Sequence, residues 1–174
     1  MAILVRRSNL LAPITDAELV KRAWQSDADA VTLDLEDGVV EPRKAEARGL
    51  VKEAIAMAAR GGAEVFVRVN APLLHADLDA SVWPGLRGIV LPRVESAADV
   101  TVATNQLTAL ERRRGLGVGT LELIVLLESA RAVWDIRSID LAFDALPREG
   151  SGPSSSWEAH EAGDGRGHHP LALD

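Results

Sequence analysis

The sequence predicts an α/β fold built around a parallel sheet. Short apolar segments alternate with longer segments of helical periodicity, which is typical of consecutive strand–helix units. The apolar segments are rich in valine, isoleucine and leucine, as strands are when they lie buried in a sheet covered on both faces. The strongest strand candidates are residues 30–35, 64–69, 88–91 and 121–127, and the weaker ones are residues 9–12 and 139–143.

Three helices are expected between these strands, each with its own start and stop signals. A capping box, a proline suited to a first helical turn and a single capping serine mark the starts. Paired glycines and a run of arginines are typical of helix ends. The starts are Thr15 with Glu18, Pro42 and Ser96, and the ends lie near residues 25, 61–62 and 112–114.

Composition excludes several classes of function. The chain has 174 residues and no cysteine, so it forms no disulfide, no thiolate metal site and no cysteine nucleophile, and we expect a reducing compartment. A net charge of −7 disfavours nucleic acid as a partner. The first residues do not resemble a secretory signal, and no apolar run is long enough to cross a membrane. We therefore expect a cytoplasmic protein.

The character of the chain changes near residue 148. Residues 148–174 are rich in glycine and serine and show no apolar periodicity, so we expect a disordered C-terminal tail after one domain of residues 1–147. Three of the four histidines, His160, His168 and His169, lie in this tail. A metal site there is the alternative, but metal sites need several convergent ligands on a supporting scaffold.

Polar residues follow the expected strands at the point where each strand ends. In a closed barrel of parallel strands, such residues meet at one mouth, where (β/α)₈ enzymes carry their chemistry. The segments concerned are residues 34–38, 68–70, 92–96 and 128–129.

These segments carry a resemblance to a known family. Arg7-Ser8, residues 33–38, Val67-Arg-Val-Asn70, residues 88–96 and Leu126-Leu-Glu-Ser129 occur in an order and spacing similar to those of the citrate lyase β-subunit and HpcH/HpaI aldolase family. The resemblance covers residues 5–137. It implies a (β/α)₈ TIM barrel that is incomplete in this chain, with about six βα units.

The resemblance also implies an activity, namely Mg²⁺-dependent cleavage or formation of a carbon–carbon bond in an acyl-CoA or oxo-acid substrate. Glu128 would be a metal ligand, since Mg²⁺ prefers carboxylate oxygen. Arg68 would bind a substrate carboxylate through two parallel hydrogen bonds. Asp37 would play a supporting role. The alternatives are an ion pair at a strand end for Arg68, a helix N-terminus for Glu128 and loop capping for Asp37.

Three further residues are candidates for substrate binding. Arg7 and Lys44 would offer positive charge to an anionic substrate, although either could be a solvated charge. Asn70 could bind substrate or simply end its strand before Pro72. Asp34 is left without a role.

The pattern departs from the family near residue 147. The family's second metal ligand is an aspartate, and its position falls on Pro147, with Asp144 nearby but out of register. We interpret the chain as a truncated or frameshifted member. A second hypothesis follows, in which the chain is a catalytically inactive remnant or an interaction subunit that pairs through its open sheet edge, as a homo-oligomer.

Overall fold

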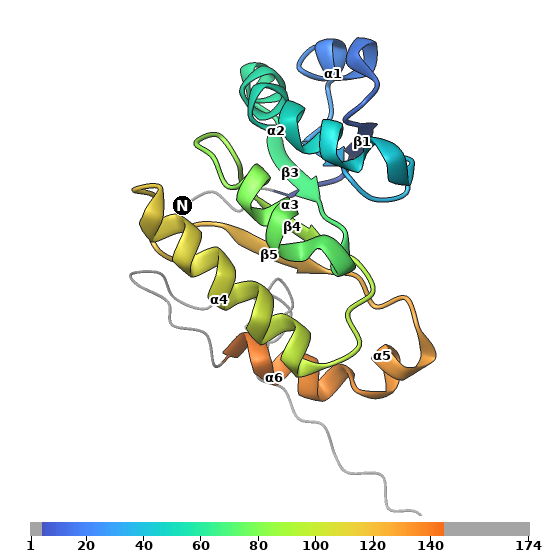
Figure 1. Ribbon diagram of the computed structural model, residues 1–174, viewed down its shortest axis with the longest axis vertical. Coiled ribbons are helices and arrows are strands. Elements are labelled where there is room, and N and C mark those ends of the chain that lie inside the picture. Colours follow the sequence, from blue (N-terminus) through green and yellow to red (C-terminus); the bar gives the residue numbers. More distant parts are fainter. Residues whose placement is uncertain (1–4, 145–174) are drawn as a thin grey trace, which may run out of the picture.

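The computed structural model describes residues 5–144, whose centre is a five-stranded parallel sheet (Figure 1). Every strand pairs with the next one along the chain, so that the spatial order equals the sequence order. Right-handed crossovers between such neighbours place all helices on one face, which is the arrangement of a barrel wall. The strands are β1 Asn9–Pro13, β2 Ala30–Asp34, β3 Glu64–Arg68, β4 Gly88–Leu91 and β5 Glu122–Val125.

Six α-helices and three short 3₁₀ turns connect and follow these strands (Figure 1). The 3₁₀ turns cover residues 41–43, 59–61 and 71–73. The α-helices are α1 Ala17–Ala23, α2 Lys44–Ala58, α3 Leu74–Ser81, α4 Ala97–Arg113, α5 Ala130–Trp134 and α6 Ile136–Asp144.

The two faces of the sheet have different surroundings because side chains alternate along a strand. Odd-numbered residues such as Val31, Val67 and Ile89 belong to the main core, to which the helices contribute their buried apolar residues. Even-numbered residues of the opposite face, among them Phe66 and Val90, form a small separate cluster. This second face corresponds to the interior of a barrel.

A ring of charges closes the amino end of that inner face. Arg6 contacts both Glu64 and Glu122, and Arg87 contacts the same two carboxylates. The guanidinium of Arg6 also lies 4.9 Å from the ring centre of Phe66. The hydrogen bond from Arg6 lowers the pKa of Glu64 despite its burial. Paired charges therefore fill the end of the barrel opposite to the polar strand ends.

The expected helix signals are confirmed at two of three starts. The 3₁₀ turn at Pro42 leads directly into α2. Ser96 caps α4 in a capping box with Asp99. The capping box predicted at Thr15 is wrong, because Asp16 is the cap of α1 and accepts a hydrogen bond from the amide of Leu19 at 3.0 Å. Helix α3 was not predicted at all.

The strand predicted at residues 139–143 is also wrong, because this segment lies in α6. Ile139 is 2% exposed, and Ala142 and Phe143 also pack on the core, whereas Leu141 is 56% exposed. This spacing of three and four residues is helical, and α6 packs against α4. The described part of the chain therefore has five strands, not the six that were expected.

Several expectations concern residues that the structure does not describe. The tail of residues 148–174, its three histidines and Pro147 lie outside the described residues. The domain boundary at residue 147 therefore stays a prediction. Within residues 5–144, no helix is long and apolar enough to span a membrane.

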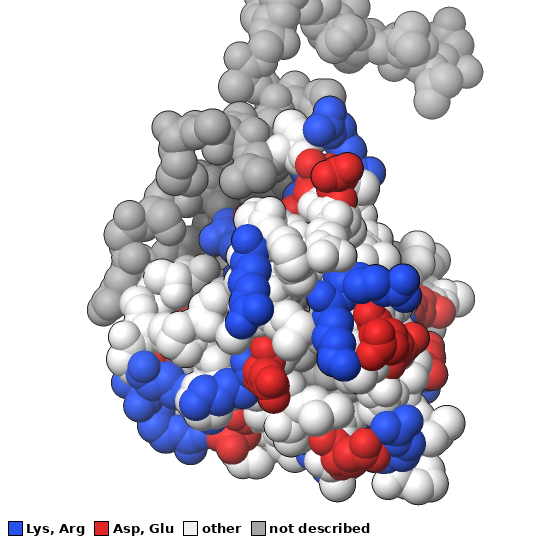
Figure 2. Space-filling view, turned by 90° about the horizontal axis from the view of Figure 1, so that it is seen from above, with Lys and Arg blue, Asp and Glu red and all other residues white. Residues whose placement is uncertain are grey.

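Basic and acidic side chains lie next to one another on the face seen from above (Figure 2). Exposed pairs such as Lys21 with Glu18 and Arg43 with Glu46 are three residues apart on one helix or turn. Exposed pairs of this kind contribute less than about 1 kcal/mol each. Fold stability therefore depends on the buried residues.

Replacing Ile139 with alanine tests the helical assignment of α6. We expect the free energy of unfolding to fall by about 2–4 kcal/mol, because a buried side chain leaves a cavity. Leu141→Ala should change it by less than about 0.5 kcal/mol, because that side chain is exposed. Urea unfolding followed by circular dichroism measures both. Equal losses for the two variants would contradict the helix, since a strand would place both residues on one face.

Candidate active site

The polar site at the carboxyl ends of the strands is organised by an ion pair between β2 and β3. Nε of Arg68 donates to Oδ1 of Asp34 at 2.8 Å, and Nη2 donates to Oδ2 at 2.7 Å. The Asp34 side chain is 1% exposed and that of Arg68 is 15% exposed. Asp34 was left unassigned by sequence reasoning, yet it holds the arginine through the two parallel hydrogen bonds that a substrate carboxylate was expected to make.

Asp34 also shapes the loop that follows β2. Its carboxylate accepts hydrogen bonds from the backbone amides of Glu36 and Gly38, each at 2.8 Å. A Cβ atom at Gly38 would lie 2.6 Å from Oδ2 of Asp34, which explains the glycine. Burial disfavours the charged carboxylate, but the hydrogen bonds from Arg68 and the two amides outweigh burial and lower the pKa of Asp34.

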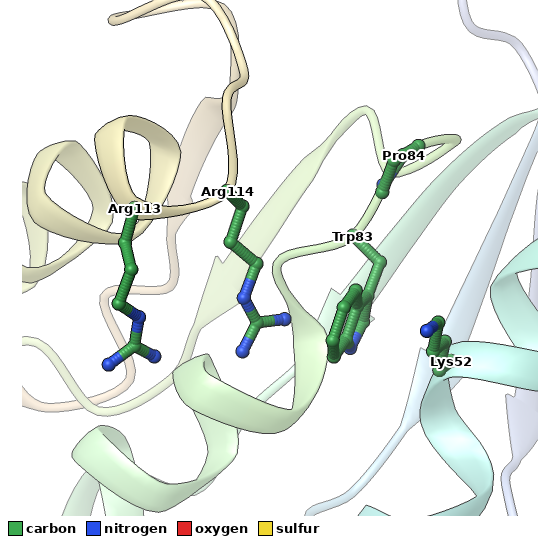
Figure 3. A pocket seen from close by; sticks show the side chains of 5 residues that line it. All are labelled: Lys52, Trp83, Pro84, Arg113 and Arg114. Atoms are coloured by element: carbon green, nitrogen blue, oxygen red, sulfur yellow. The ribbon is translucent and has the colours of Figure 1, made fainter.

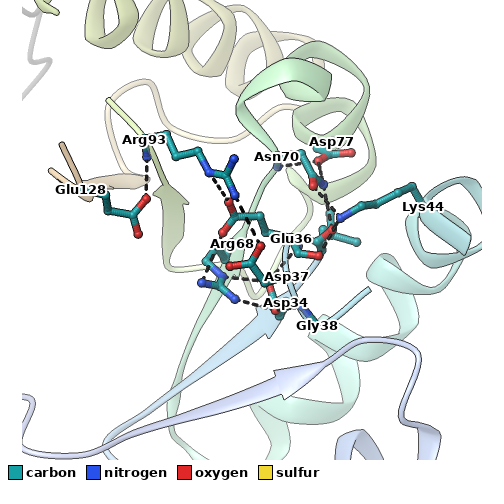
Figure 4. A network of polar contacts seen from close by, with 11 residues as sticks. Asp34, Glu36, Asp37, Gly38, Lys44, Arg68, Asn70, Asp77, Arg93 and Glu128 are labelled. Atoms are coloured by element: carbon teal, nitrogen blue, oxygen red, sulfur yellow. Dashed lines mark hydrogen bonds and ion pairs between the residues drawn. The ribbon is translucent and has the colours of Figure 1, made fainter. Parts of the chain in front are cut away.

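Glu36 lies at the centre of the site, between two arginines (Figure 4). Its Oε2 is 3.3 Å from Nη1 of Arg68, and its Oε1 is 3.1 Å from Nε of Arg93. Burial and the nearby charge of Asp37 raise the pKa of Glu36, and the two arginines do not compensate fully. A buried carboxyl group with a raised pKa is a common feature of catalytic sites.

Arg93 connects this centre to Glu128. Its backbone has a φ of 57°, a left-handed conformation that is uncommon for residues other than glycine and often marks functional sites. Its backbone amide donates to Oε2 of Glu128 at 3.1 Å, while its guanidinium reaches Glu36 and lies 3.5 Å from Oδ1 of Asp37. Arg68 and Glu128 therefore share one chain of contacts through Glu36 and Arg93.

A cavity of about 230 Å³ opens beside Glu128. It is lined by Arg93, Glu95, Glu128 and Ser129, with Ser129 also capping α5. Glu128 is exposed and belongs to no ion pair among residues 5–144. Arg68 does not line this cavity, and its guanidinium contacts Glu36 rather than open space.

The expectation that Lys44 and Asn70 bind substrate directly needs correction. Nζ of Lys44 donates to the backbone oxygens of Leu35 and Glu36 and to Oδ1 of Asn70, at 2.6–2.7 Å. Nδ2 of Asn70 donates to the Leu35 oxygen at 2.8 Å and to Oδ2 of Asp77 at 2.7 Å. Because both side chains are buried and their polar atoms are occupied, they hold the ends of β2 and β3 together beneath the site.

Arg7 lies at the opposite end of the sheet from the other candidates. It precedes β1, its backbone amide donates to Oδ2 of Asp29 at 2.8 Å, and its side chain is 80% exposed. The expected place at the substrate mouth is therefore wrong, because residues that precede a parallel strand lie at its amino end. The alternative of a solvated charge fits Arg7.

Sequence reasoning missed the two residues that connect the site. Glu36 was given no role, since the supporting role was assigned to its neighbour Asp37. The Asp37 side chain proves to be 69% exposed, and among residues 5–144 its ion-pair partner is Arg93. Arg93 carried no signal beyond its place after a strand, since positive φ cannot be recognised in an arginine. The sequence analysis therefore did not predict the contacts through Glu36 and Arg93 that connect Arg68 to Glu128.

The described residues fit Mg²⁺ in part. Glu128 offers a carboxylate at a cavity, Glu95 lies beside it, and Mg²⁺ usually retains several waters and needs only one or two carboxylates. Residues 5–144 contain no group of three or more histidine, cysteine, aspartate or glutamate residues suited to a metal ion. Within this range the carboxylates at the cavity are those of Glu95 and Glu128, and waters or substrate oxygens would fill the remaining coordination positions.

Comparison with known proteins identifies the family. The model of the HpcH/HpaI aldolase/citrate lyase family matches residues 7–146, so the chain belongs to this family. It is 34% identical over 145 residues to the citrate lyase subunit beta of Leuconostoc mesenteroides subsp. cremoris, covering 82% of this chain and 48% of that protein. It is 33% identical over 139 residues to L-malyl-CoA/beta-methylmalyl-CoA lyase of Cereibacter sphaeroides, covering 76% of this chain and 43% of that protein.

Solved structures confirm the fold class of an incomplete TIM-like barrel. The CitE protein of Mycobacterium tuberculosis, in complex with magnesium and acetoacetate, superimposes with a TM-score of 0.58 at 27% identity, covering 82% of this chain and 53% of that chain. The malate synthase of Haloferax volcanii, as a magnesium/glyoxylate complex, superimposes with a TM-score of 0.68 at 21% identity. This match covers 78% of this chain and 46% of that chain. The chain thus spans about half the length of the relatives it matches.

Replacing Asp34 with asparagine tests the ion pair that organises the site. We expect a loss of about 3 kcal/mol in the free energy of unfolding at neutral pH, because the substitution leaves the Arg68 charge without its partner. Asp27→Asn, at an exposed aspartate before the other end of β2, should cost less than about 0.5 kcal/mol. Urea unfolding measures both variants.

The same pair predicts a pH dependence. A carboxyl whose pKa is lower in the folded state stabilises the fold above its ordinary pKa, which is 3.8, and that contribution disappears as the pH falls through the folded value. The parent protein should therefore lose stability below about pH 3.8, and the loss should be smaller in Asp34→Asn. Parallel stability curves for the two proteins would contradict the assignment.

Proposed function

We propose that the chain provides the first part of a Mg²⁺-dependent carbon–carbon lyase that acts on an acyl-CoA or oxo-acid substrate. The observation that carries this proposal is the contact chain from Arg68 through Glu36 and Arg93 to Glu128, at the carboxyl ends of four neighbouring strands. The relatives named as citrate lyase subunit beta and malyl-CoA lyase supply the reaction class.

The side chains have distinct roles in this proposal. Glu128 would hold Mg²⁺, which when bound supplies positive charge beside the substrate carbonyl. Arg68 and Arg93 both direct guanidinium nitrogens at Glu36, so an anionic substrate group placed near Glu36 meets two cations. Arg93 is the more available of the two, because 63% of its side chain is exposed. Asp37 would orient Arg93.

The raised pKa of Glu36 fits this arrangement. Protonation of Glu36 would free Nη1 of Arg68 and Nε of Arg93 for a substrate carboxylate, while Arg68 keeps its two hydrogen bonds to Asp34 and Arg93 keeps its ion pair with Asp37. The neutral group can also donate a hydrogen bond to the substrate. Glu36 would thus couple substrate binding to a proton, in addition to its contacts with the arginines.

Glu128→Gln tests the metal role. The parent chain should bind Mg²⁺ in isothermal titration calorimetry, and the variant should bind at least about tenfold more weakly because an amide oxygen carries no full charge. Glu53→Gln, at an exposed glutamate of α2, is the matched control and should bind as the parent does. Turnover is measured with a panel of acyl-CoA and oxo-acid substrates. A folded chain that binds no Mg²⁺ and cleaves none of them would contradict the proposal.

The second candidate is an interaction subunit that associates with copies of itself. Within residues 5–144, β1 and β5 each pair with only one other strand, so both sheet edges are open. Leu11 lies on the inner face in register with Thr32 and is 46% exposed, and Trp134 of α5 is 88% exposed. Open edges and exposed apolar residues favour association. A cytoplasmic location is part of both proposals.

Leu11→Glu tests this association. Light scattering should show a homo-oligomer for the parent chain and a smaller species for the variant, because a charge on the inner face opposes its burial. Val102→Glu, at an exposed valine of α4, should leave the mass unchanged. A parent chain that is monomeric at all concentrations tested would rule out the second candidate.

A further inference from the structure

A second cavity, of about 450 Å³, shares no lining residue with the cavity beside Glu128 (Figure 3). It opens between α2, the C-terminal end of α4 and the segment that joins α3 to β4. The end of α4 precedes β5 and the other segment precedes β4, so the cavity lies toward the amino ends of these strands. Arg68 and Glu128 instead lie at the carboxyl ends of their strands. The lining residues are Lys52, Trp83, Pro84, Arg113 and Arg114.

The indole of Trp83 fixes the position of two cations. Its Nε1 donates to the backbone oxygen of Ala80 at 2.8 Å, which orients the ring. The guanidinium of Arg114 lies 3.6 Å from the ring centre, and Nζ of Lys52 lies 4.1 Å from it. Figure 3 shows the two cations on opposite sides of the indole. Cation–π attraction therefore places both charges before any ligand arrives.

Arg114 serves the fold as well as the cavity. Its Nη1 donates to the backbone oxygen of Val82 at 2.7 Å, and its Nη2 donates to that of Asp79 at 2.6 Å. Only 12% of its side chain is exposed. These hydrogen bonds satisfy carbonyl groups at the end of α3, so Arg114 supplies the cavity with charge from a fixed position.

Lys52 and Arg113 are the cations that can reach a ligand. Lys52 is exposed and pairs with no carboxylate among residues 5–144. Arg113 is 61% exposed and shares Asp79 with Arg114. Of the three cations that line the cavity, two share the carboxylate of Asp79 and the third has no carboxylate partner among residues 5–144, although the whole chain has a net charge of −7. The excess of positive charge is local to this cavity.

We propose that this cavity binds a small organic molecule that carries a phosphate group. The Lys52 ammonium donates charge-assisted hydrogen bonds to phosphate oxygens from one side of the indole, and the Arg113 guanidinium adds positive charge from the other side. Trp83 and Pro84 provide the apolar wall for the organic part, and the volume suits a ligand of nucleotide size. This site needs neither Mg²⁺ nor the lyase site, so it stands apart from the proposed function.

Calorimetric titration of the whole chain with adenosine diphosphate, in buffer containing a magnesium chelator, tests the site. We expect saturable binding that weakens about tenfold in Lys52→Met, because one charge-assisted contact is lost. Lys52→Arg should restore most of the affinity. Arg112→Met removes an exposed cation from the same end of α4 without touching the cavity and should bind as the parent does.

Adenosine, which lacks the phosphate groups, should not bind measurably. Circular dichroism confirms that each variant is folded, which is expected since Lys52 and Arg112 are exposed. The proposal is overturned if the folded parent chain shows no saturable binding, or if adenosine binds as tightly as the diphosphate. Equal losses in Lys52→Met and Arg112→Met would also overturn it, because they would indicate attraction to positive charge in general.

Discussion

The ion pair between Asp34 and Arg68 is the constraint on which the arrangement of the candidate active site depends. Both hydrogen bonds join the ends of β2 and β3 across 2.7–2.8 Å, in a place where Asp34 is almost completely buried. A buried carboxylate needs such a partner, since an unpaired charge would be costly in the interior. The remaining nitrogen of Arg68 then points at Glu36, and Glu36 reaches Arg93. The site is therefore built outward from a structural pair.

Beneath this pair, a lysine holds the same two strand ends from the other side. Lys44 donates three buried hydrogen bonds, two to backbone oxygens of the loop after β2 and one to Asn70. Arg48 extends the network through Asp77. Lys44 and Asn70, which sequence patterns assign to substrate binding, thus provide support. The charged groups left for a ligand are Nη1 of Arg68 and the side chains of Arg93 and Glu128, with Glu36 between the two arginines. The family motifs indicate where the site lies, but they do not distinguish residues that support its structure from residues that bind a ligand.

The sequence predicts the fold well and the site only in outline. Strand positions follow from apolar runs, and Ser96 caps its helix as expected because local hydrogen bonding determines a cap. Ile139 was misplaced because a short apolar segment fits either a strand or a helix, and only packing on α4 decides between them. The occupation of Lys44 and Asn70, and the positive φ of Arg93, depend on tertiary contacts that one sequence does not reveal.

Carbon-13 nuclear magnetic resonance titration of the Glu36 carboxyl, without and with Mg²⁺, tests the central claim most directly. The account predicts a pKa above the ordinary value of 4.5 without the metal, because Glu36 is buried beside Asp37 and near Glu128. It predicts a lower pKa when Mg²⁺ is present, since a cation at Glu128 favours the charged form of Glu36. A Glu36 carboxyl that titrates at its ordinary value and does not respond to Mg²⁺ would contradict a shared site at these strand ends.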